Sequence, residues 1–90
     1  MKISFDPAKR EKTLAERGLD FADAARIFAG RILTALDDRI DYGEDRYITY
    51  GYLDDRAVIL VWAPRHRSRR IISMRYANDR ERQFYEAALD

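Results

Sequence analysis

The chain of 90 residues contains no cysteine, which excludes disulfide bonds and zinc sites built from thiolates. It has a single histidine, His66, which is too few for a histidine-based metal centre. No apolar stretch approaches the roughly 20 residues that span a membrane, and the first residues lack the apolar run of a signal peptide. We therefore expect a cytoplasmic protein that needs no metal ion, no cofactor and no membrane.

Lysine is also scarce, being limited to Lys2, Lys9 and Lys12, so arginine supplies most of the positive charge. Residues 46–90 contain nine arginines, no lysine and six acidic residues, whereas residues 1–45 carry a small excess of acid. A guanidinium is permanently charged and binds phosphate through two parallel hydrogen bonds. A general bias toward arginine would explain the residue type but not the clustering, which indicates a surface suited to a polyanion.

The length and composition predict a single small domain that covers residues 1–90. Hydrophobic residues make up 47% of the chain and charged residues 37%, so a small core and an ionic surface are expected. Such a core gives only modest stability, and an oligomer or a bound partner is therefore expected as well.

The first third of the chain predicts a short strand followed by two helices. The strand covers residues 1–5. The first helix starts at Asp6 and Pro7, runs to about residue 17 and stops at Gly18. The second is capped by Asp20 and ends near residue 30. Its apolar stripe is predicted to contain Phe21, Ala24, Ala25 and Phe28, with Ile27 at the margin.

The remainder predicts four strands and a last helix. The strands cover residues 31–36, 46–53, 56–63 and 69–76, with a charged loop at 37–45 and turns at 54–55 and 64–68. The last helix opens at Asn78, with Glu81 as its capping-box partner and with Phe84, Tyr85 and Ala88 facing inward and Leu89 beside them. The fold class is therefore α+β: an antiparallel β-meander with two N-terminal helices and one C-terminal helix, in the order βααββββα.

The turns fix a strand register. A two-residue turn at 54–55 pairs Leu53 with Arg56, and across the next turn we pair Ala63 with Arg69. One face of the sheet then collects the apolar residues Val58, Leu60, Trp62, Ile72 and Met74. The opposite face collects Arg46, Ile48, Tyr50, Tyr52, Ile59, Arg69, Ser73 and Arg75. The first face is the predicted core, and the second is a candidate site.

The candidate catalytic residues follow from what cleavage of a phosphodiester requires. RNA supplies its own nucleophile, so a protein needs only a base, an acid and cations near the phosphate. Arg46 and Arg75 are the best-placed cations. Glu44 is a candidate base and His66 a candidate for proton transfer near neutral pH. Solvated loop residues are the other interpretation of both, and the more common one for a lone histidine or carboxylate in a turn or loop.

Other residues are candidates for binding a nucleic acid. Tyr50 and Tyr52 have the ring faces on which bases stack, although packing under a helix explains them as well. Arg65, Arg67 and Arg69 form a cationic run that is either a polyanion patch or a solvated hairpin tip.

Three segments in this order resemble the BrnT toxin family of type II toxin–antitoxin systems: FDPAKREKTLAERGLDFADAARIF, DYGEDRYITYG and RRIISMRYANDRERQFYE. The resemblance implies a RelE-like fold and a ribonuclease that arrests translation. It also implies a BrnA-type antitoxin, a ribbon-helix-helix protein that joins the toxin in a 2:2 complex and binds operator DNA. Lys9, in the segment Asp-Pro-Ala-Lys, becomes a further candidate RNA-binding cation.

Two hypotheses of different classes result. The first is a metal-independent endoribonuclease toxin that acts through arginine-based electrostatic stabilisation. The alternative is a non-catalytic module whose arginine-rich sheet face binds nucleic acid or an acidic protein segment. Cleavage of purified RNA distinguishes the two.

Overall fold

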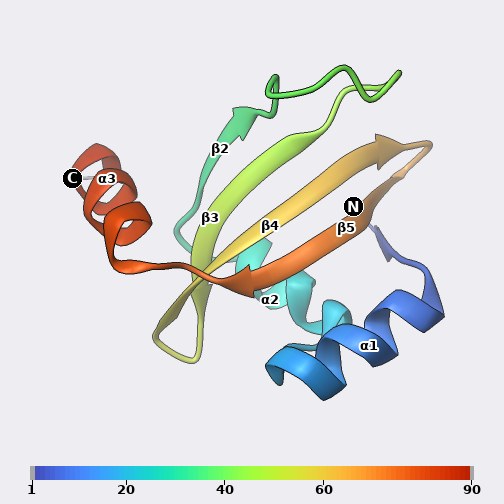
Figure 1. The fold of residues 1–90 in the computed structure, drawn as a ribbon, viewed down its shortest axis with the longest axis horizontal. Coiled ribbons are helices and arrows are strands. Elements are labelled where there is room, and N and C mark those ends of the chain that lie inside the picture. Colours follow the sequence, from blue (N-terminus) through green and yellow to red (C-terminus); the bar gives the residue numbers. More distant parts are fainter. Residues whose placement is uncertain (1, 90) are drawn as a thin grey trace.

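The computed structural model describes residues 2–89, which form one five-stranded sheet with helices on either side (Figure 1). In chain order the elements are β1 (Lys2–Ser4), α1 (Pro7–Arg17), a short 3₁₀ helix η1 (Phe21–Asp23), α2 (Ala24–Phe28), β2 (Leu33–Leu36), β3 (Tyr47–Leu53), β4 (Arg56–Arg65), β5 (Ser68–Tyr76) and α3 (Asp79–Leu89). The α+β class predicted from the sequence is confirmed.

The sheet is mixed, so the prediction of a purely antiparallel sheet was wrong. Its strand order is β1-β5-β4-β3-β2, and β1 runs parallel to β5 with Ile3 opposite Arg69. The helical segments after β1 carry the chain across the sheet to β2. As a result β1 lies at one edge, beside β5, and β2 lies at the opposite edge. Met1, which belonged to the predicted first strand, lies outside the described residues.

The capping signals at the start of the chain act as predicted. The Asp6 carboxylate accepts a hydrogen bond from the Ala8 N–H at 2.9 Å, and Gly18 ends α1 in the left-handed conformation. The second predicted helix is instead the 3₁₀ helix η1 followed by α2. Its buried stripe contains Ile27, whereas Ala25 is exposed, so the predicted stripe was rotated slightly too far.

The hairpin between β3 and β4 has the predicted register. Leu53 pairs with Arg56, and Asp54 and Asp55 both have positive φ, at 49° and 65°. Two successive left-handed residues are the geometry of a type I′ turn, whose twist matches that of the strands it joins. A two-residue turn of this kind fixes the register of the two strands, so the pairing of β3 with β4 could be predicted from the sequence.

The hairpin between β4 and β5 differs from the prediction. The strands continue to Arg65 and from Ser68, so the turn contains only two residues, and Ala63 pairs with Arg70 rather than with Arg69. A β-bulge then occurs at Ile72, which is left without a cross-strand partner. In the part of β5 between the turn and the bulge, from Ser68 to Ile71, the side chains that face the core are therefore the ones predicted to face away from it.

Two residues change sides because of the bulge. Ile71, at 1% exposure, occupies the core position predicted for Ile72. Arg69 lies on the core side, where its guanidinium is 4.0 Å from the centre of the Phe28 ring. The prediction that Arg69 lies on the same face as Arg75 was therefore wrong.

The core lies between the sheet and the segment from α1 to α2. It contains Leu19, Phe21, Ala24, Ile27, Leu53, Val58, Leu60, Trp62, Ile71 and Met74. Thr49 is the buried polar residue within it, and its hydroxyl accepts a hydrogen bond from the Trp62 indole at 2.8 Å. Burying the apolar side chains is the main source of stability, and the Thr49 hydroxyl satisfies the indole N–H.

The last helix, α3, lies apart from α1 and α2 (Figure 1). The predicted capping box is present, because Asn78 and Glu81 exchange backbone and side-chain hydrogen bonds of 3.0 and 2.8 Å. Tyr85 stacks on Tyr50 with ring centres 4.8 Å apart. Phe84 and Ala88, which were predicted to face inward, are exposed, Phe84 to 67%, so α3 is attached along a narrow strip.

Candidate functional site

The face of the sheet opposite the core carries the candidate site. It contains Ile48 of β3, Ile59 and Val61 of β4, and Ser73 and Arg75 of β5. We call this surface the open face; α3 contacts it at Tyr50 and Tyr52 of β3 and, through Glu81, at Arg75 of β5. Its floor is apolar or small, and its charged side chains come from the margins.

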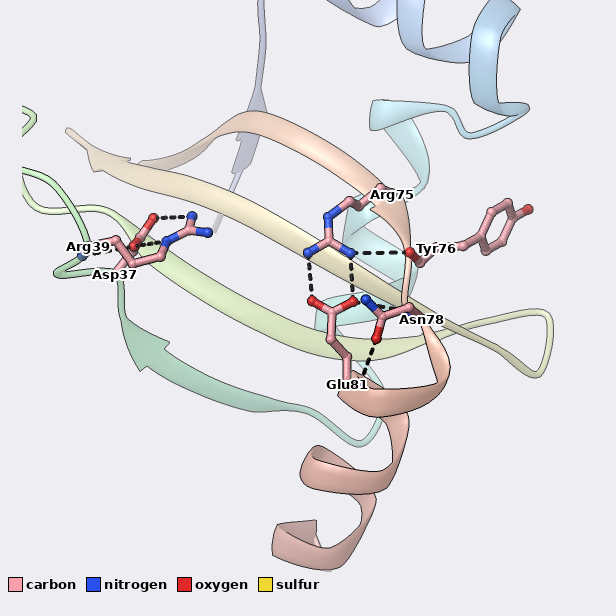
Figure 2. Close-up of polar contacts among 6 residues, drawn as sticks. All are labelled: Asp37, Arg39, Arg75, Tyr76, Asn78 and Glu81. Carbon is pink, nitrogen blue, oxygen red and sulfur yellow. Dashed lines mark hydrogen bonds and ion pairs between the residues drawn. The ribbon is translucent and has the colours of Figure 1, made fainter.

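Arg75 forms the first ion pair of the open face. Its two terminal nitrogens donate to the two oxygens of Glu81 at 2.7 and 2.6 Å (Figure 2). Hydrogen bonding to Arg75 holds the pKa of Glu81 below its ordinary value, and Glu81 in turn raises the pKa of Arg75. Because Glu81 is also the capping-box residue of α3, the start of this helix fixes the orientation of the guanidinium.

A second ion pair comes from the loop after β2. Arg39 donates through Nε and Nη2 to both oxygens of Asp37, at 2.7 and 2.9 Å. The Asp37 carboxylate is buried, and the hydrogen bonds from Arg39 lower its pKa to about 2. The Tyr42 hydroxyl donates to the same carboxylate at 3.3 Å. The positive charge of Arg39 also acts on Arg75 and on Glu81, so the two pairs lie within electrostatic range of each other.

Glu44 is the centre of a third group. Its carboxylate forms an ion pair with Arg65, with a closest N–O distance of 2.8 Å, and lies 3.6 Å from Nε of Arg46. The Arg46 guanidinium is 4.1 Å from the centre of the Tyr42 ring, and its buried Nε has no hydrogen-bond partner. Among the predicted site residues, the structure thus brings Glu44, Arg46 and Arg65 together.

Arg46 and Arg75 occupy different ends of the open face. Arg75 pairs with Ile59, whereas Arg46 precedes Tyr47, which pairs with Trp62 further along β4. At about 3.3 Å per residue and 4.8 Å per strand, their backbones are roughly 16 Å apart. The two predicted cations are thus not adjacent.

His66 lies still further from Arg75. It is an exposed residue of the turn between β4 and β5, beyond the end of β4 at Arg65. From the level of Ile59 to that of Arg65 the strand rises by about 20 Å. His66 and Arg67 therefore sit at the hairpin tip, next to the group around Glu44 and remote from the pair of Arg75 and Glu81.

The two predicted stacking tyrosines lie beneath or beside α3. Tyr50 is fully buried under Tyr85, and burial raises the pKa of its hydroxyl. A base cannot reach this ring in the structure, so packing, the other role considered for it, is the one observed. Tyr52 is partly exposed and its hydroxyl donates to Glu86 at 3.4 Å.

Lys9 lies outside the open face but close to its margin. It is an exposed residue of α1 and shares a shallow pocket with Ile72 and Ser73 of β5. Ser73 is on the open face opposite Val61, so a ligand that extends beyond β5 would meet the Lys9 side chain.

Comparison with known protein families identifies the chain. Residues 5–81 match the family described as ribonuclease toxin, BrnT, of type II toxin-antitoxin system. The chain belongs to the BrnT family. No curated protein sequence matches it significantly. Membership of the BrnT family indicates a ribonuclease toxin, and therefore RNA as the substrate class and an antitoxin as the partner class.

Three residues at the open face of this BrnT chain were not predicted from the sequence to belong to the site. Asp37 and Arg39 appeared only as part of a charged loop, and Glu81 only as a capping residue. A loop has no periodicity from which a buried position can be read, so nothing distinguished Asp37 from its neighbour Asp38. Glu81 carried a usable signal, because it follows Arg75 closely and is fixed by Asn78.

Two further properties of this BrnT chain concern metals and membranes. Within residues 2–89, no three side chains of His, Cys, Asp or Glu are grouped so that they could hold a metal ion. No helix in the same range is both long and apolar enough to cross a membrane.

Proposed function

We propose that this BrnT toxin is a metal-independent endoribonuclease that binds single-stranded RNA across the open face and stops translation and growth by cutting it. The observation that carries the proposal is the presence of three carboxylate-held arginine groups around one apolar floor: Arg75, Arg39 and the neighbours Arg46 and Arg65. Arginines that are already oriented lose little freedom on binding phosphate, which favours both affinity and catalysis.

The chemistry requires two proton transfers and one stabilised phosphate. The 2′-oxygen forms a bond to phosphorus while the bond to the 5′-oxygen breaks, leaving a 2′,3′-cyclic phosphate and a 5′-hydroxyl. A base accepts the 2′-hydroxyl proton, and an acid donates a proton to the leaving oxygen. We assign phosphate contacts to Arg46 and Arg75, and the proton transfers to Glu44 or His66 at the hairpin end of the face.

The finer identity of the partner is also part of the proposal. We expect a BrnA-type ribbon-helix-helix antitoxin that covers the open face with an acidic and apolar segment. A dimeric antitoxin would give a 2:2 complex that binds operator DNA through the antitoxin. Charge pairing with the arginines would make association fast and sensitive to salt.

Cleavage of purified RNA tests the function directly. The purified chain should cut single-stranded RNA in excess EDTA, and the products should carry 2′,3′-cyclic phosphate ends. An otherwise identical strand with 2′-O-methyl riboses should remain intact, because its nucleophile is blocked. Loss of cleavage in EDTA that magnesium restores would contradict metal independence.

Binding without cleavage would favour the alternative, a non-catalytic module that uses the same arginine-rich face. Inducible expression in bacteria supplies a second readout. The toxin should arrest growth while RNA degrades, and co-expression with a ribbon-helix-helix antitoxin should protect the cells and yield a co-purifying complex.

A further inference from the structure

Asp37 is an unusual residue for a protein of this size. It is only 4% exposed, although it lies in a charged loop at the margin of the sheet. Removing a carboxylate from water is unfavourable unless hydrogen bonds compensate for the loss. Here the compensation comes from Arg39, Tyr42 and the Arg39 backbone N–H, at distances between 2.7 and 3.3 Å.

The partner of this buried carboxylate is, by contrast, exposed. The side chain of Arg39 is 63% exposed, and its guanidinium is directed along the open face toward Arg75 and Glu81 (Figure 2). The two hydrogen bonds to Asp37 use Nε and Nη2, which leaves Nη1 outside the ion pair. The buried Asp37 thus acts as a fixed support for an accessible cation.

Arg39 lies within electrostatic range of the pair of Arg75 and Glu81, because its charge acts on both groups. Each of the two guanidinium groups is held by both oxygens of one carboxylate, so both keep a defined orientation. Two oriented cations on one side of the sheet match the repeated negative charges of a nucleic-acid backbone better than one does.

We propose that Arg39 is an RNA-contacting residue that binds a backbone phosphate next to the one held by Arg75, and that Asp37 positions it. This inference rests on the proposed function, because it assigns a further residue to the same RNA-binding face. The ligand class is the phosphodiester backbone of single-stranded RNA.

The principal difficulty for a test is that Arg39 also neutralises a buried charge. Replacing Arg39 alone leaves Asp37 buried without its main partner, which can impair folding. The double variant Asp37→Asn with Arg39→Gln removes both charges and leaves two neutral amides. Arg39→Gln should therefore be measured alone and together with Asp37→Asn, with the melting temperature of each variant recorded.

A matched control exists elsewhere in the chain. Arg10 and Asp20 form an ion pair of the same geometry, with distances of 2.7 and 3.0 Å, but the pair joins α1 to the start of η1. The variant Arg10→Gln thus removes an equally well-formed arginine–carboxylate pair at a site outside the open face.

The readout is binding of a 2′-O-methyl RNA oligonucleotide, measured by fluorescence anisotropy at several salt concentrations. Loss of one charge-assisted contact should weaken binding roughly 10- to 100-fold in both Arg39→Gln and the double variant. The slope of log K against log salt should become shallower by about 0.7, the value for one phosphate contact on a single strand. Arg10→Gln should bind like the wild type.

The outcomes separate this inference from the proposed function. If the double variant binds as the wild type does, Arg39 serves only to neutralise Asp37 and the inference is wrong. If the wild type binds RNA but never cleaves it, the nuclease proposal fails, while a binding defect in the double variant still supports Arg39 as a contact residue. If wild-type affinity for the oligonucleotide is too weak to measure, both proposals fail.

Discussion

The two faces of the sheet contain alternate residues of the same strands, yet they treat polar groups in opposite ways. On the core face the buried Thr49 and Trp62 are neutral and hydrogen-bond to each other, while the charged Arg69 packs on the Phe28 ring. On the open face they are charged, and each arginine is paired with a carboxylate, as in the pair of Arg75 and Glu81. The core face gains stability from apolar burial. The open face positions charges.

This difference shows how a chain of 90 residues combines a stable fold with a charged binding surface. Exposed ion pairs contribute little to stability, so Arg46 and Arg75 can be replaced at small cost to the fold, whereas Arg39 also neutralises the buried Asp37. Side chains of the core face cannot be replaced at small cost, because each removal leaves a cavity. Variants on the two faces should therefore separate loss of fold from loss of activity.

The largest effect is expected on the core face. Leu60 is fully buried, and the variant Leu60→Ala should lower the free energy of unfolding by about 2–5 kcal/mol. Thermal unfolding should show a melting temperature lower by about 10 °C or more. Val61→Ala, one residue further on the open face, is the control and should lose less. Equal losses at the two positions would contradict the division of roles.

The next largest effect is expected on activity alone. Arg75→Ala removes an oriented guanidinium from the open face, and loss of a charge-assisted hydrogen bond to a phosphate typically costs about 1.5–3 kcal/mol of binding free energy. RNA cleavage at low RNA concentration should fall roughly 10- to 100-fold, and growth arrest should be relieved, while the melting temperature changes little. Arg46→Ala should likewise reduce RNA cleavage and relieve growth arrest. If both variants are folded and fully toxic, the assignment of phosphate contacts is wrong.

The division between the faces could be predicted from the sequence only where a local signal fixed the geometry. The Asp54-Asp55 turn did so, and with it the register that places Tyr50 opposite Ile59. The bulge at Ile72 could not be predicted, because Ile71 and Ile72 are both apolar and either one satisfies the alternation. Its consequence was the misplaced Arg69.

The candidate site was partly predictable for the same reason. Arg46 and Arg75 follow from strand alternation, which is a local property. The contact between Arg39 and buried Asp37 depends on how the loop between β2 and β3 folds back on the sheet, where the Asp37 N–H donates to the Arg46 carbonyl at 2.8 Å. The parallel pairing of β1 with β5 is equally non-local, since it joins residues far apart in the sequence.

A smaller effect is expected from the polar pair on the core face. Thr49→Val keeps the shape of the side chain but leaves the Trp62 indole N–H buried without its acceptor. The free energy of unfolding should fall by about 1–3 kcal/mol, measured by urea denaturation. Thr34→Val is the control, because Thr34 is exposed and its hydroxyl bonds to the Thr49 hydroxyl at 2.8 Å and not to the indole. Identical losses would show that the indole hydrogen bond contributes nothing.

The smallest effect concerns Asp37, the charged residue buried at the margin of the open face. Hydrogen bonds from Arg39 lower its pKa from 3.8 to about 2 in the folded chain. The unfolded chain therefore binds this proton more readily, and the stability that Asp37 contributes at neutral pH is lost as the pH falls from about 4 to 2. The pKa values of Asp20 and Glu81 are also lowered, so the total stability falls in acid for several reasons.

The contribution of Asp37 is therefore measured as the difference in the free energy of unfolding between the wild type and Asp37→Asn. This stability gap should shrink by about 1–2 kcal/mol over this window, after allowance for screening of the exposed Arg39. Urea unfolding at pH 6, 4 and 2.5 measures the gap. A gap that stays constant would mean that Arg39 does not stabilise the ionised carboxylate, and Asp37 could then not be the support that orients it.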